Sequence, residues 1–229
     1  MTTLNSTDHR SRVAQERRER MRQRLIESAM LVFAEKGVDA SVIDDVIAAA
    51  NVSRGSFYNY FRTNTELLGA VGEQLGNEMM QIIEPLVGGI ADPAARIATG
   101  LRLYLWLAQE YPLLGRFVSR AGLSALSPNS LVFEYLPPHL VAGVALGRFV
   151  DTGIEVALDL IAGTMLLALS RISRGEIVPD YDAQVVATVM MGLGVPVEEA
   201  RRLARMSPPA VTIADGTLLA RSVSLDAAT

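Results

Sequence analysis

Apolar residues recur at helical spacing along almost the whole chain, and this periodicity constrains the fold more than any other feature of the sequence. Near the amino terminus they stand at positions 25, 26, 29, 32 and 33, on one face of a helix. Gly37 follows Lys36 and can adopt the left-handed conformation that ends a helix, so a helix is predicted from about Gln15 to Lys36. Beyond Pro93 nearly every segment again has helical periodicity, and strand signals are almost absent. The sequence therefore predicts an all-α fold.

The size and composition of the chain favour two domains with a large buried area. Its 229 residues leave room for a small domain and a larger one. Half of the residues are hydrophobic and the mean hydropathy is +0.26, which indicates an extensive core, a buried subunit interface, or both. The uncharged run 160–170 is too short to cross a bilayer, and the run 183–197 is interrupted by glycine and proline. Charges near the amino terminus argue against a signal peptide, so we expect a cytoplasmic protein without a membrane partner.

Charge is distributed unevenly along the chain. The whole chain carries −4, but residues 1–62 hold ten Lys and Arg against eight Asp and Glu, or +2, so the remaining 167 residues carry −6. Seven arginines lie within 10–24, where only Glu16 and Glu19 oppose them. This asymmetry suits a basic nucleic-acid reader on an acidic body. Two interpretations of the basic segment stay open: an arm that contacts DNA, or a solvated helix with i,i+4 ion pairs.

Residues 41–61 predict two short helices joined by a tight turn. Ser41, with Asp44 three residues later, fits an N-cap for a helix that continues through Ala50. Asn51 tolerates the positive φ that a sharp turn requires, and Ser53 can cap a second helix over 54–60. Two short helices with such a turn are typical of a helix-turn-helix motif.

A third capping signal follows directly. Thr63 and Glu66 form a capping box, which predicts a long helix to about Glu84, just before Pro85.

The second short helix presents polar side chains that can contact DNA. Phe57 and Phe61 are four residues apart and point inward, which leaves the polar positions outside. Arginine suits guanine or phosphate, asparagine suits adenine or phosphate, and tyrosine hydroxyls and helix amino termini donate to phosphate oxygens. We expect DNA contacts from Ser41, Ser53, Arg54, Gly55, Ser56, Tyr58, Asn59, Tyr60, Arg62, Thr63 and Asn64.

Several short motifs over roughly residues 20–70 occur together in this order: Asp45-Val46, Ala49-Ala50-Asn51-Val52-Ser53, Gly55, Phe57-Tyr58-Asn59-Tyr60-Phe61 and Glu66-Leu67-Leu68. This arrangement resembles the TetR-type (TetR/AcrR-like) family of transcriptional regulators. The resemblance implies a three-helix helix-turn-helix DNA-binding domain joined to a larger α-helical ligand-binding and dimerisation domain. It also implies a homodimeric repressor of palindromic operator DNA, released by a small, largely apolar effector.

The chain departs from the family pattern at three positions. Asn51 replaces the usual glycine of the turn, Asn64 stands where lysine is favoured, and Asp44 stands where a basic residue is common. The last two changes reduce the local attraction for phosphate, so we expect Arg54, Arg62 and the amino-terminal arginines to supply more of it.

The chain is expected to divide into four parts: a flexible basic arm (1–14), the helix-turn-helix domain (15–62), a helical regulatory and dimerisation domain (63–206) and a carboxyl-terminal tail (207–229). The tail has no convincing periodicity, although 210–221 could pack on the body. Helices of the body are predicted at about 93–110, 113–121, 130–149 with a break at Pro137 and Pro138, 152–174, 181–192 and 196–206.

Two sets of body residues are candidates for ligand binding and for dimerisation. An apolar cavity with few polar groups is the usual form of a small-molecule site, and the helix at 152–174 is apolar on so many sides that a core and an interface are both expected to cover it. The candidate ligand residues are Met79, Leu103, Tyr104, Trp106, Leu107, Phe117, Phe133, Tyr135, His139 and Met165. The candidate interface residues are Ile161, Thr164, Met165, Ala168, Val185, Val186, Val189 and Met190.

The sequence offers little for catalysis. It has no cysteine, only two histidines, no glycine loop that could hold a phosphate and no metal-ligand spacing, so neither an enzyme, a cofactor nor a metal is expected. The alternative to a DNA-binding regulator is a helical ligand-binding or scaffold protein in which 41–61 is only a compact helical hairpin.

Overall fold

The computed structural model describes residues 4–39, 42–127 and 129–227, and every regular element within these ranges is a helix, as predicted. The elements are α1 (Leu4–Lys36), α2 (Ile43–Ala49), α3 (Arg54–Tyr58), α4 (Asn64–Val87), α5 (Pro93–Glu110), α6 (Pro112–Ala121), the 3-10 turn η2 (Gly122–Ala125), α7 (Val132–Ala145), α8 (Ile154–Ser173), α9 (Tyr181–Gly192), α10 (Val197–Ala204) and α11 (Leu218–Ala227).

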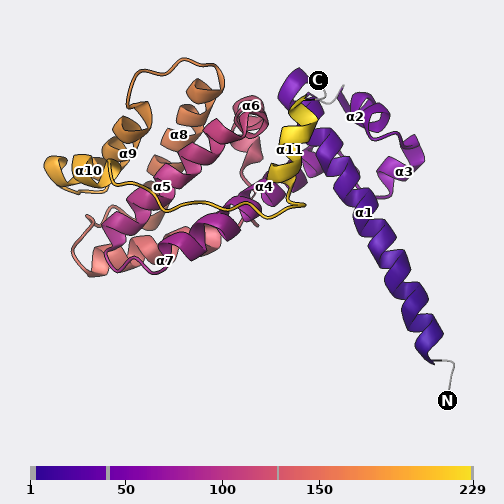
Figure 1. Cartoon of the computed structure of the whole chain (residues 1–229), viewed down its shortest axis with the longest axis horizontal. Coiled ribbons are helices and arrows are strands. Elements are labelled where there is room, and N and C mark those ends of the chain that lie inside the picture. Colours follow the sequence, from indigo (N-terminus) through magenta and orange to yellow (C-terminus); the bar gives the residue numbers. More distant parts are fainter. Residues whose placement is uncertain (1–3, 40–41, 128, 228–229) are drawn as a thin grey trace.

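The helices form two regions that share one hydrophobic core. The first region contains α1, α2 and α3, and α5 with α7 to α10 forms the larger body at the other end of the molecule (Figure 1). Between them lie α4, α6 and α11 (Figure 1). The ring of Phe33 in α1 lies 6.4 Å from that of Phe117 in α6, and both side chains are fully buried. Burial of this contact joins the first region directly to α6.

Four predicted local signals hold in and next to the first region, whereas the N-cap predicted at Ser41 falls outside the described residues. Gly37 ends α1 with φ of 91°, and Asn51 has φ of 49° in the turn between α2 and α3. The Ser53 hydroxyl accepts a hydrogen bond from Ser56 N at 3.1 Å, and Thr63 Oγ1 accepts one from Glu66 N at 3.1 Å. These side chains satisfy backbone donors that a helix start leaves free, which fixes where α3 and α4 begin.

Three predicted helix boundaries are wrong because proline is tolerated inside two helices. Helix α4 continues through Pro85 to Val87, and α7 runs unbroken through Pro137 and Pro138. Each proline removes the hydrogen bond to the carbonyl four residues earlier. Those carbonyls belong to Gln81, Phe133 and Glu134, all three exposed residues, so water can take the place of the missing donor.

The two ends of the described chain are more ordered than predicted. Helix α1 begins at Leu4, so residues 4–14 are helical rather than a flexible arm, while residues 1–3 lie outside the described part. At the other end, residues 205–217 run along the body and α11 packs against α1, α4 and α6 (Figure 1). Glu78 accepts hydrogen bonds from Leu218 N and Leu219 N at 2.8 and 3.0 Å, and Arg221 pairs with Glu27 of α1 at 2.8 Å. The carboxyl-terminal tail therefore ends in a helix that joins α1 to the central helices α4 and α6.

Helix α8 meets the length and composition expected of a membrane-spanning segment. It also packs against α5, α6, α7 and α9, and Ala157, Ile161, Met165, Ala168 and Leu169 are buried by these contacts. Core packing thus accounts for one face of the helix.

Candidate functional site

The outward face of α3 is held in place by two buried rings beneath it. Phe57 is fully buried, and its ring lies 6.3 Å from that of Phe61. Tyr58 and Asn59 stay exposed, and Ser56 and Tyr60 are half-buried. Because the rings fix the rotation of α3, the predicted contact residues from Ser53 to Tyr60 share one accessible surface.

Gly55 leaves this surface open to close approach. A Cβ at Gly55 would meet nothing nearer than Ser53 Oγ at 4.0 Å, so the space above the backbone is free. A partner such as a DNA strand could reach the backbone there.

Arg54 is paired inside the same surface. Its guanidinium donates to the carboxylate of Asp44 in α2, and both side chains are about two-thirds exposed. An exposed pair of this kind contributes little stability, about 0–1 kcal/mol. Its main effect is electrostatic, because the negative charge of Asp44 offsets the positive charge of Arg54 at the start of α3.

Residues after α3 divide into exposed and buried ones. Arg62 and Thr63 are exposed, and the backbone N–H of Arg62 donates to Glu66 Oε2 at 2.8 Å. Asn64 was predicted to contact DNA, but it is buried and its amide donates to Val38 O at 2.6 Å. Asn64 thus anchors the start of α4 to the loop after α1 and is removed from the DNA-facing set. Ser41 lies outside the described residues.

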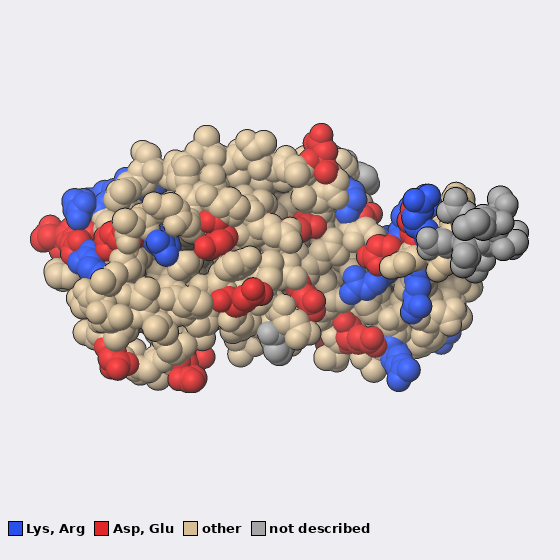
Figure 2. Space-filling model, turned by 90° about the horizontal axis from the view of Figure 1, so that it is seen from below, with Lys and Arg blue, Asp and Glu red and all other residues tan. Residues whose placement is uncertain are grey.

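Charge is concentrated unevenly on the surface. Lys and Arg side chains lie at both ends of the face in view, the end that carries α1 and the opposite one, whereas Asp and Glu predominate over the middle (Figure 2). The acidic middle agrees with the net negative charge of residues 63–229.

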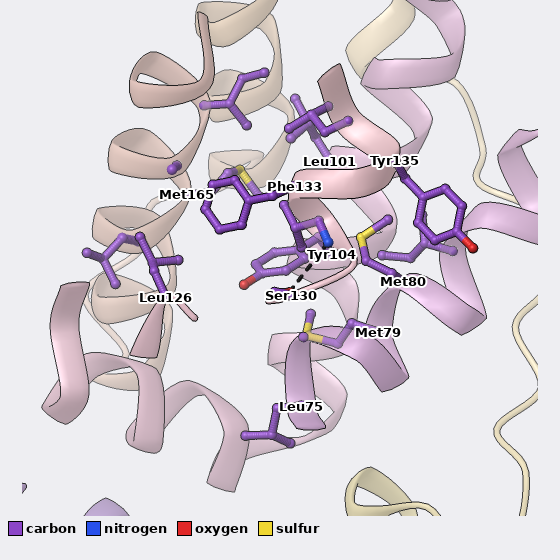
Figure 3. A pocket seen from close by; sticks show the side chains of 18 of the residues that line it. Leu75, Met79, Met80, Leu101, Tyr104, Leu126, Ser130, Phe133, Tyr135 and Met165 are labelled. Carbon is purple, nitrogen blue, oxygen red and sulfur yellow. Dashed lines mark hydrogen bonds between the residues drawn. The ribbon is translucent and has the colours of Figure 1, made fainter. Parts of the chain in front are cut away.

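The body contains an apolar cavity between α4, α5, α6, α7 and α8. Its volume is about 160 Å³. Figure 3 shows Tyr104, Phe133 and Met165 around it, with Leu75 and Met79 contributed by α4. Of the predicted ligand residues, the walls include Met79, Tyr104, Phe117, Phe133, Tyr135, His139 and Met165.

The other three predicted ligand residues do not line the cavity. Leu103 and Leu107 are buried in the core, and Trp106 packs against the core from a half-buried position. The cavity face of α5 is formed by Ile97, Leu101 and Tyr104, at spacings of four and three residues. Because α5 is buried on more than one side, its apolar pattern could not show which side borders the cavity.

A polar chain closes one part of the cavity wall. His139 Nδ1 lies 3.1 Å from Arg96 Nη1, and His139 Nε2 lies 3.1 Å from both carboxylate oxygens of Glu84. An arginine can only donate, so Nδ1 is the acceptor and Nε2 carries the hydrogen that Glu84 accepts. Glu84 and Arg96 were not predicted; the i,i+4 series 75, 79 and 83 in α4 is the signal that would have indicated this wall.

The hydroxyl of Tyr104 adds a polar group to the cavity wall. Burial raises the pKa of Tyr104 to about 12, so its phenol stays protonated near neutral pH. A protonated phenol can both donate and accept a hydrogen bond. The cavity can therefore hold a mainly apolar molecule with a hydroxyl or carbonyl group.

The predicted dimer-interface residues are mostly part of the core of this chain. Ile161, Met165, Ala168, Val185, Val186, Val189 and Met190 are all buried, and Thr164 is half-buried. A side chain already buried in one protomer cannot form the interface, so the prediction is wrong for these seven residues, while the half-buried Thr164 stays a prediction. The exposed apolar residues of α8 are instead Val156 and Leu167, 58% and 67% exposed, with the half-buried Leu160 and Gly163 between them.

No group of His, Asp or Glu side chains within the described ranges has the arrangement of a metal site.

Two family models match the chain in succession. The model for bacterial regulatory proteins of the tetR family matches residues 25–71, and the model for the tetracyclin repressor-like carboxyl-terminal domain matches residues 92–206. The second match alone spans half of the chain.

Curated relatives are similar over about a third to two-fifths of the chain. The HTH-type transcriptional repressor DhaR of Mycobacterium sp. (strain GP1) is 33% identical over 76 residues, which are 33% of this chain and 38% of the relative. The probable acrEF/envCD operon repressor of Escherichia coli (strain K12) is 34% identical over 92 residues, 40% of this chain and 42% of the relative. The chain thus matches about two-fifths of the length of these relatives.

Solved structures match over most of the chain. RolR in complex with its ligand resorcinol has a TM-score of 0.66 and 28% identity, covering 86% of this chain and 100% of that protein. RolR without ligand has a TM-score of 0.67 and 27% identity, covering 83% and 100%. The fatty acid degradation regulator FadR from Bacillus halodurans, at 18% identity and a TM-score of 0.58, covers 75% of this chain and 96% of its own, and shares the fold.

Proposed function

The chain belongs to the TetR family of bacterial regulatory proteins, and on that premise we propose that it is a ligand-responsive transcriptional repressor. In this proposal it binds palindromic operator DNA as a homodimer in the cytoplasm, and a small, largely apolar molecule in the body releases it. The protein is a regulator without an enzymatic role.

The observation that carries the proposal is that one helix belongs to both sites. Asn64, at the start of α4, donates a hydrogen bond to Val38 in the loop after α1, within the DNA-binding domain. Leu75, Met79 and Ile83 of the same helix line the cavity. A ligand that displaces these side chains moves α4, and the amino-terminal end of α4 is attached to the DNA-binding domain. A coupling free energy of about 1–3 kcal/mol would lower operator affinity about 5- to 150-fold.

The cavity favours a single-ring effector. Its volume of about 160 Å³ is close to that of an engineered apolar cavity of about 150 Å³ that accommodates benzene. Tyr104 and the His139 chain add hydrogen-bonding groups, so a ring with one or two hydroxyl groups fits the chemistry. RolR, whose ligand is resorcinol, offers a precedent in a protein of the same fold.

Exposed apolar residues of α8 supply the proposed dimer surface. Val156, Leu160, Gly163 and Leu167 follow each other at spacings of three or four residues and form one stripe. A stripe of this kind on a long helix packs well against a second copy of itself. Two-fold symmetry then predicts two operator half-sites, one or more duplex turns of about 34 Å apart.

Fluorescence anisotropy with duplexes from the upstream region of its own gene tests the proposal. We expect saturable binding to one palindromic duplex, no comparable binding to a scrambled duplex, and a steep loss of affinity with salt. Equal binding to both duplexes, or none, would contradict the proposal and favour a helical ligand-binding or scaffold protein.

A further inference from the structure

Helix α1 is much longer than its packing against the other helices of the DNA-binding domain requires. Among the described side chains of α1, the first fully buried one is Leu25, and the side chains of residues 11–20 are exposed. The segment before Leu25 would extend about 30 Å at 1.5 Å per residue. Figure 1 shows this half of α1 projecting beyond the remaining helices. Packing inside the protomer does not explain why such a segment lies beside α3.

A groove lies between this projecting half of α1 and the end of α3. Arg17 and Arg18 line it from α1, and Ser56, Asn59 and Tyr60 line it from the reader. It is open to solvent and has a volume of about 890 Å³. The groove therefore continues the surface that α3 presents to DNA, rather than forming a separate site elsewhere.

The orientation of α1 at the base of the groove is held by Arg22. Its guanidinium carbon lies 5.7 Å from the centre of the Phe61 ring, within the range of a cation–π interaction. Phe61 also packs on Phe57 beneath α3. Helix α1 and the reader surface are thus attached through the same aromatic pair.

Within the described part of the chain, the guanidinium groups of Arg17 and Arg18 make neither a hydrogen bond nor an ion pair. Other arginines nearby are engaged: Arg12 pairs with Glu16 at 3.7 Å, and Arg54 pairs with Asp44. The two groove arginines thus keep their full donor capacity for a partner. A guanidinium fork matches the geometry of phosphate oxygens.

We propose that this groove holds the sugar–phosphate backbone beside the major groove that α3 enters, with Arg17 and Arg18 donating to its phosphates. The inference rests on the proposed function. DNA is favoured over an acidic peptide or an anionic membrane because the reader residues Ser56 and Asn59 form the opposite wall. A duplex lying on α3 brings one strand into the groove. The amino-terminal half of α1 is then a second DNA-contacting element that supplies affinity without sequence preference.

The test compares the salt dependence of operator binding between two double variants. Arg17→Gln/Arg18→Gln removes the groove cations, and Arg201→Gln/Arg205→Gln removes two exposed arginines at α10, at the far end of the body. Each lost phosphate contact reduces the slope of log K against log salt by about 0.9. Because the homodimer carries each arginine twice, the groove variant lacks four phosphate contacts, and between 50 and 200 mM salt the wild type should lose about 150-fold more affinity than this variant. The α10 variant should follow the wild type.

The outcomes separate this inference from the proposed function. A shallower slope with an unchanged preference for operator over scrambled duplex supports the groove. A slope equal to that of the α10 variant overturns the groove alone, as does a loss of sequence preference without a change in slope. Weaker binding to anionic vesicles with an unchanged DNA slope assigns the groove to a membrane surface and also overturns the inference. A wild type that prefers no duplex overturns the proposed function itself.

A second measurement locates the strand directly. The chain has no cysteine, so Ala14→Cys gives a single attachment point in the groove wall for an iron chelate that cleaves nearby backbone. We expect cuts beside the major groove of each half-site. Ser207→Cys, in the exposed segment after α10, should give none. Identical cleavage patterns from both positions would overturn the inference.

Discussion

At the scale of single residues, the pair between Arg54 and Asp44 controls how much positive charge the reader offers to DNA. Asp44→Asn frees the guanidinium and removes a negative charge beside the phosphates, so operator binding should tighten several-fold at low salt. Arg54→Ala should weaken specific binding by about 1–3 kcal/mol if the side chain contacts a base. Anisotropy titrations of both variants check this. Weaker binding by Asp44→Asn would show that the pair itself, rather than the free arginine, contacts DNA.

Tyr104 gives a prediction about the effector. Tyr104→Phe keeps the ring and removes the hydroxyl, so a phenolic effector should bind about 5- to 150-fold more weakly, the equivalent of about 1–3 kcal/mol for an unsatisfied polar group. Benzene, which has no polar group to satisfy, should bind wild type and variant alike. Calorimetry with both molecules measures the difference. Since burial raises the pKa of Tyr104 to about 12, effector affinity should not reflect its ionisation near neutral pH. An equal effect on both molecules would mean that the substitution altered the cavity rather than a hydrogen bond.

A three-residue ion cluster gives a prediction about acid stability. Arg148 donates to Asp92 at 2.7 Å and to Glu199 at 2.7 Å, and these hydrogen bonds hold the pKa of both carboxyl groups below their ordinary values. A lowered carboxyl pKa stabilises the fold above the ordinary values of 3.8 and 4.5, and this contribution is lost as the pH falls below them. Arg148→Gln should therefore reduce the free energy of unfolding by about 1–2 kcal/mol at pH 7. Urea titrations at pH 7 and at pH 3.5 should show the difference shrinking in acid; a constant difference would exclude the cluster as its source.

Residue-level predictions from sequence succeeded where the cause is local. Ser53, Thr63 and Asn51 act on backbone atoms within three residues of themselves, so their roles follow from sequence alone. Asn64 was misplaced because its partner, Val38, is 26 residues away and depends on tertiary packing. Glu84 of α4 and Arg96 of α5, which contact the predicted His139 of α7, were missed for the same reason.

At the scale of elements, α11 is held at its amino terminus by a carboxylate from another helix. Glu78→Gln replaces the anion that caps Leu218 N and Leu219 N with a neutral amide, so it should cost about 0.5–2 kcal/mol and expose the carboxyl terminus to proteolysis. Glu198→Gln, at an exposed position in α10, is the matched control. Limited proteolysis followed by mass spectrometry reads out the release of α11. Equal protection in both variants would mean that Leu218 and Leu219, both fully buried, hold the helix without the cap.

The sequence predicted the helical type of the elements correctly and their boundaries less accurately. The periodic segments at 93–110 and 181–192 match α5 and α9, because apolar side chains of both helices are buried in the core. The start of α1 was placed too late because residues 11–20 are all exposed and so show no apolar period; Arg, Gln and Glu favour a helix without one. The predicted break in α7 fails because the carbonyls freed by its two prolines belong to exposed residues.

At the scale of the whole molecule, the apolar stripe of α8 determines the oligomeric state in this account. Leu167→Arg places a charge in the proposed interface, so the protein should sediment as a monomer at micromolar concentration and lose affinity for a full palindrome more than for a half-site. Val223→Arg changes a similarly exposed residue on α11 and should stay dimeric. A dimeric Leu167→Arg variant would place the interface elsewhere. The sequence could not locate this stripe, because an apolar residue covered by its own chain and one covered by a partner have the same pattern.

The central claim is that the cavity and the reader are coupled through α4. Operator affinity measured by anisotropy with and without saturating resorcinol tests this most directly. The account predicts a 5- to 150-fold loss of affinity, the range of about 1–3 kcal/mol typical of allosteric coupling, with the same factor separating resorcinol affinities of the free and DNA-bound protein. Resorcinol that binds in the cavity and leaves operator affinity unchanged would contradict it.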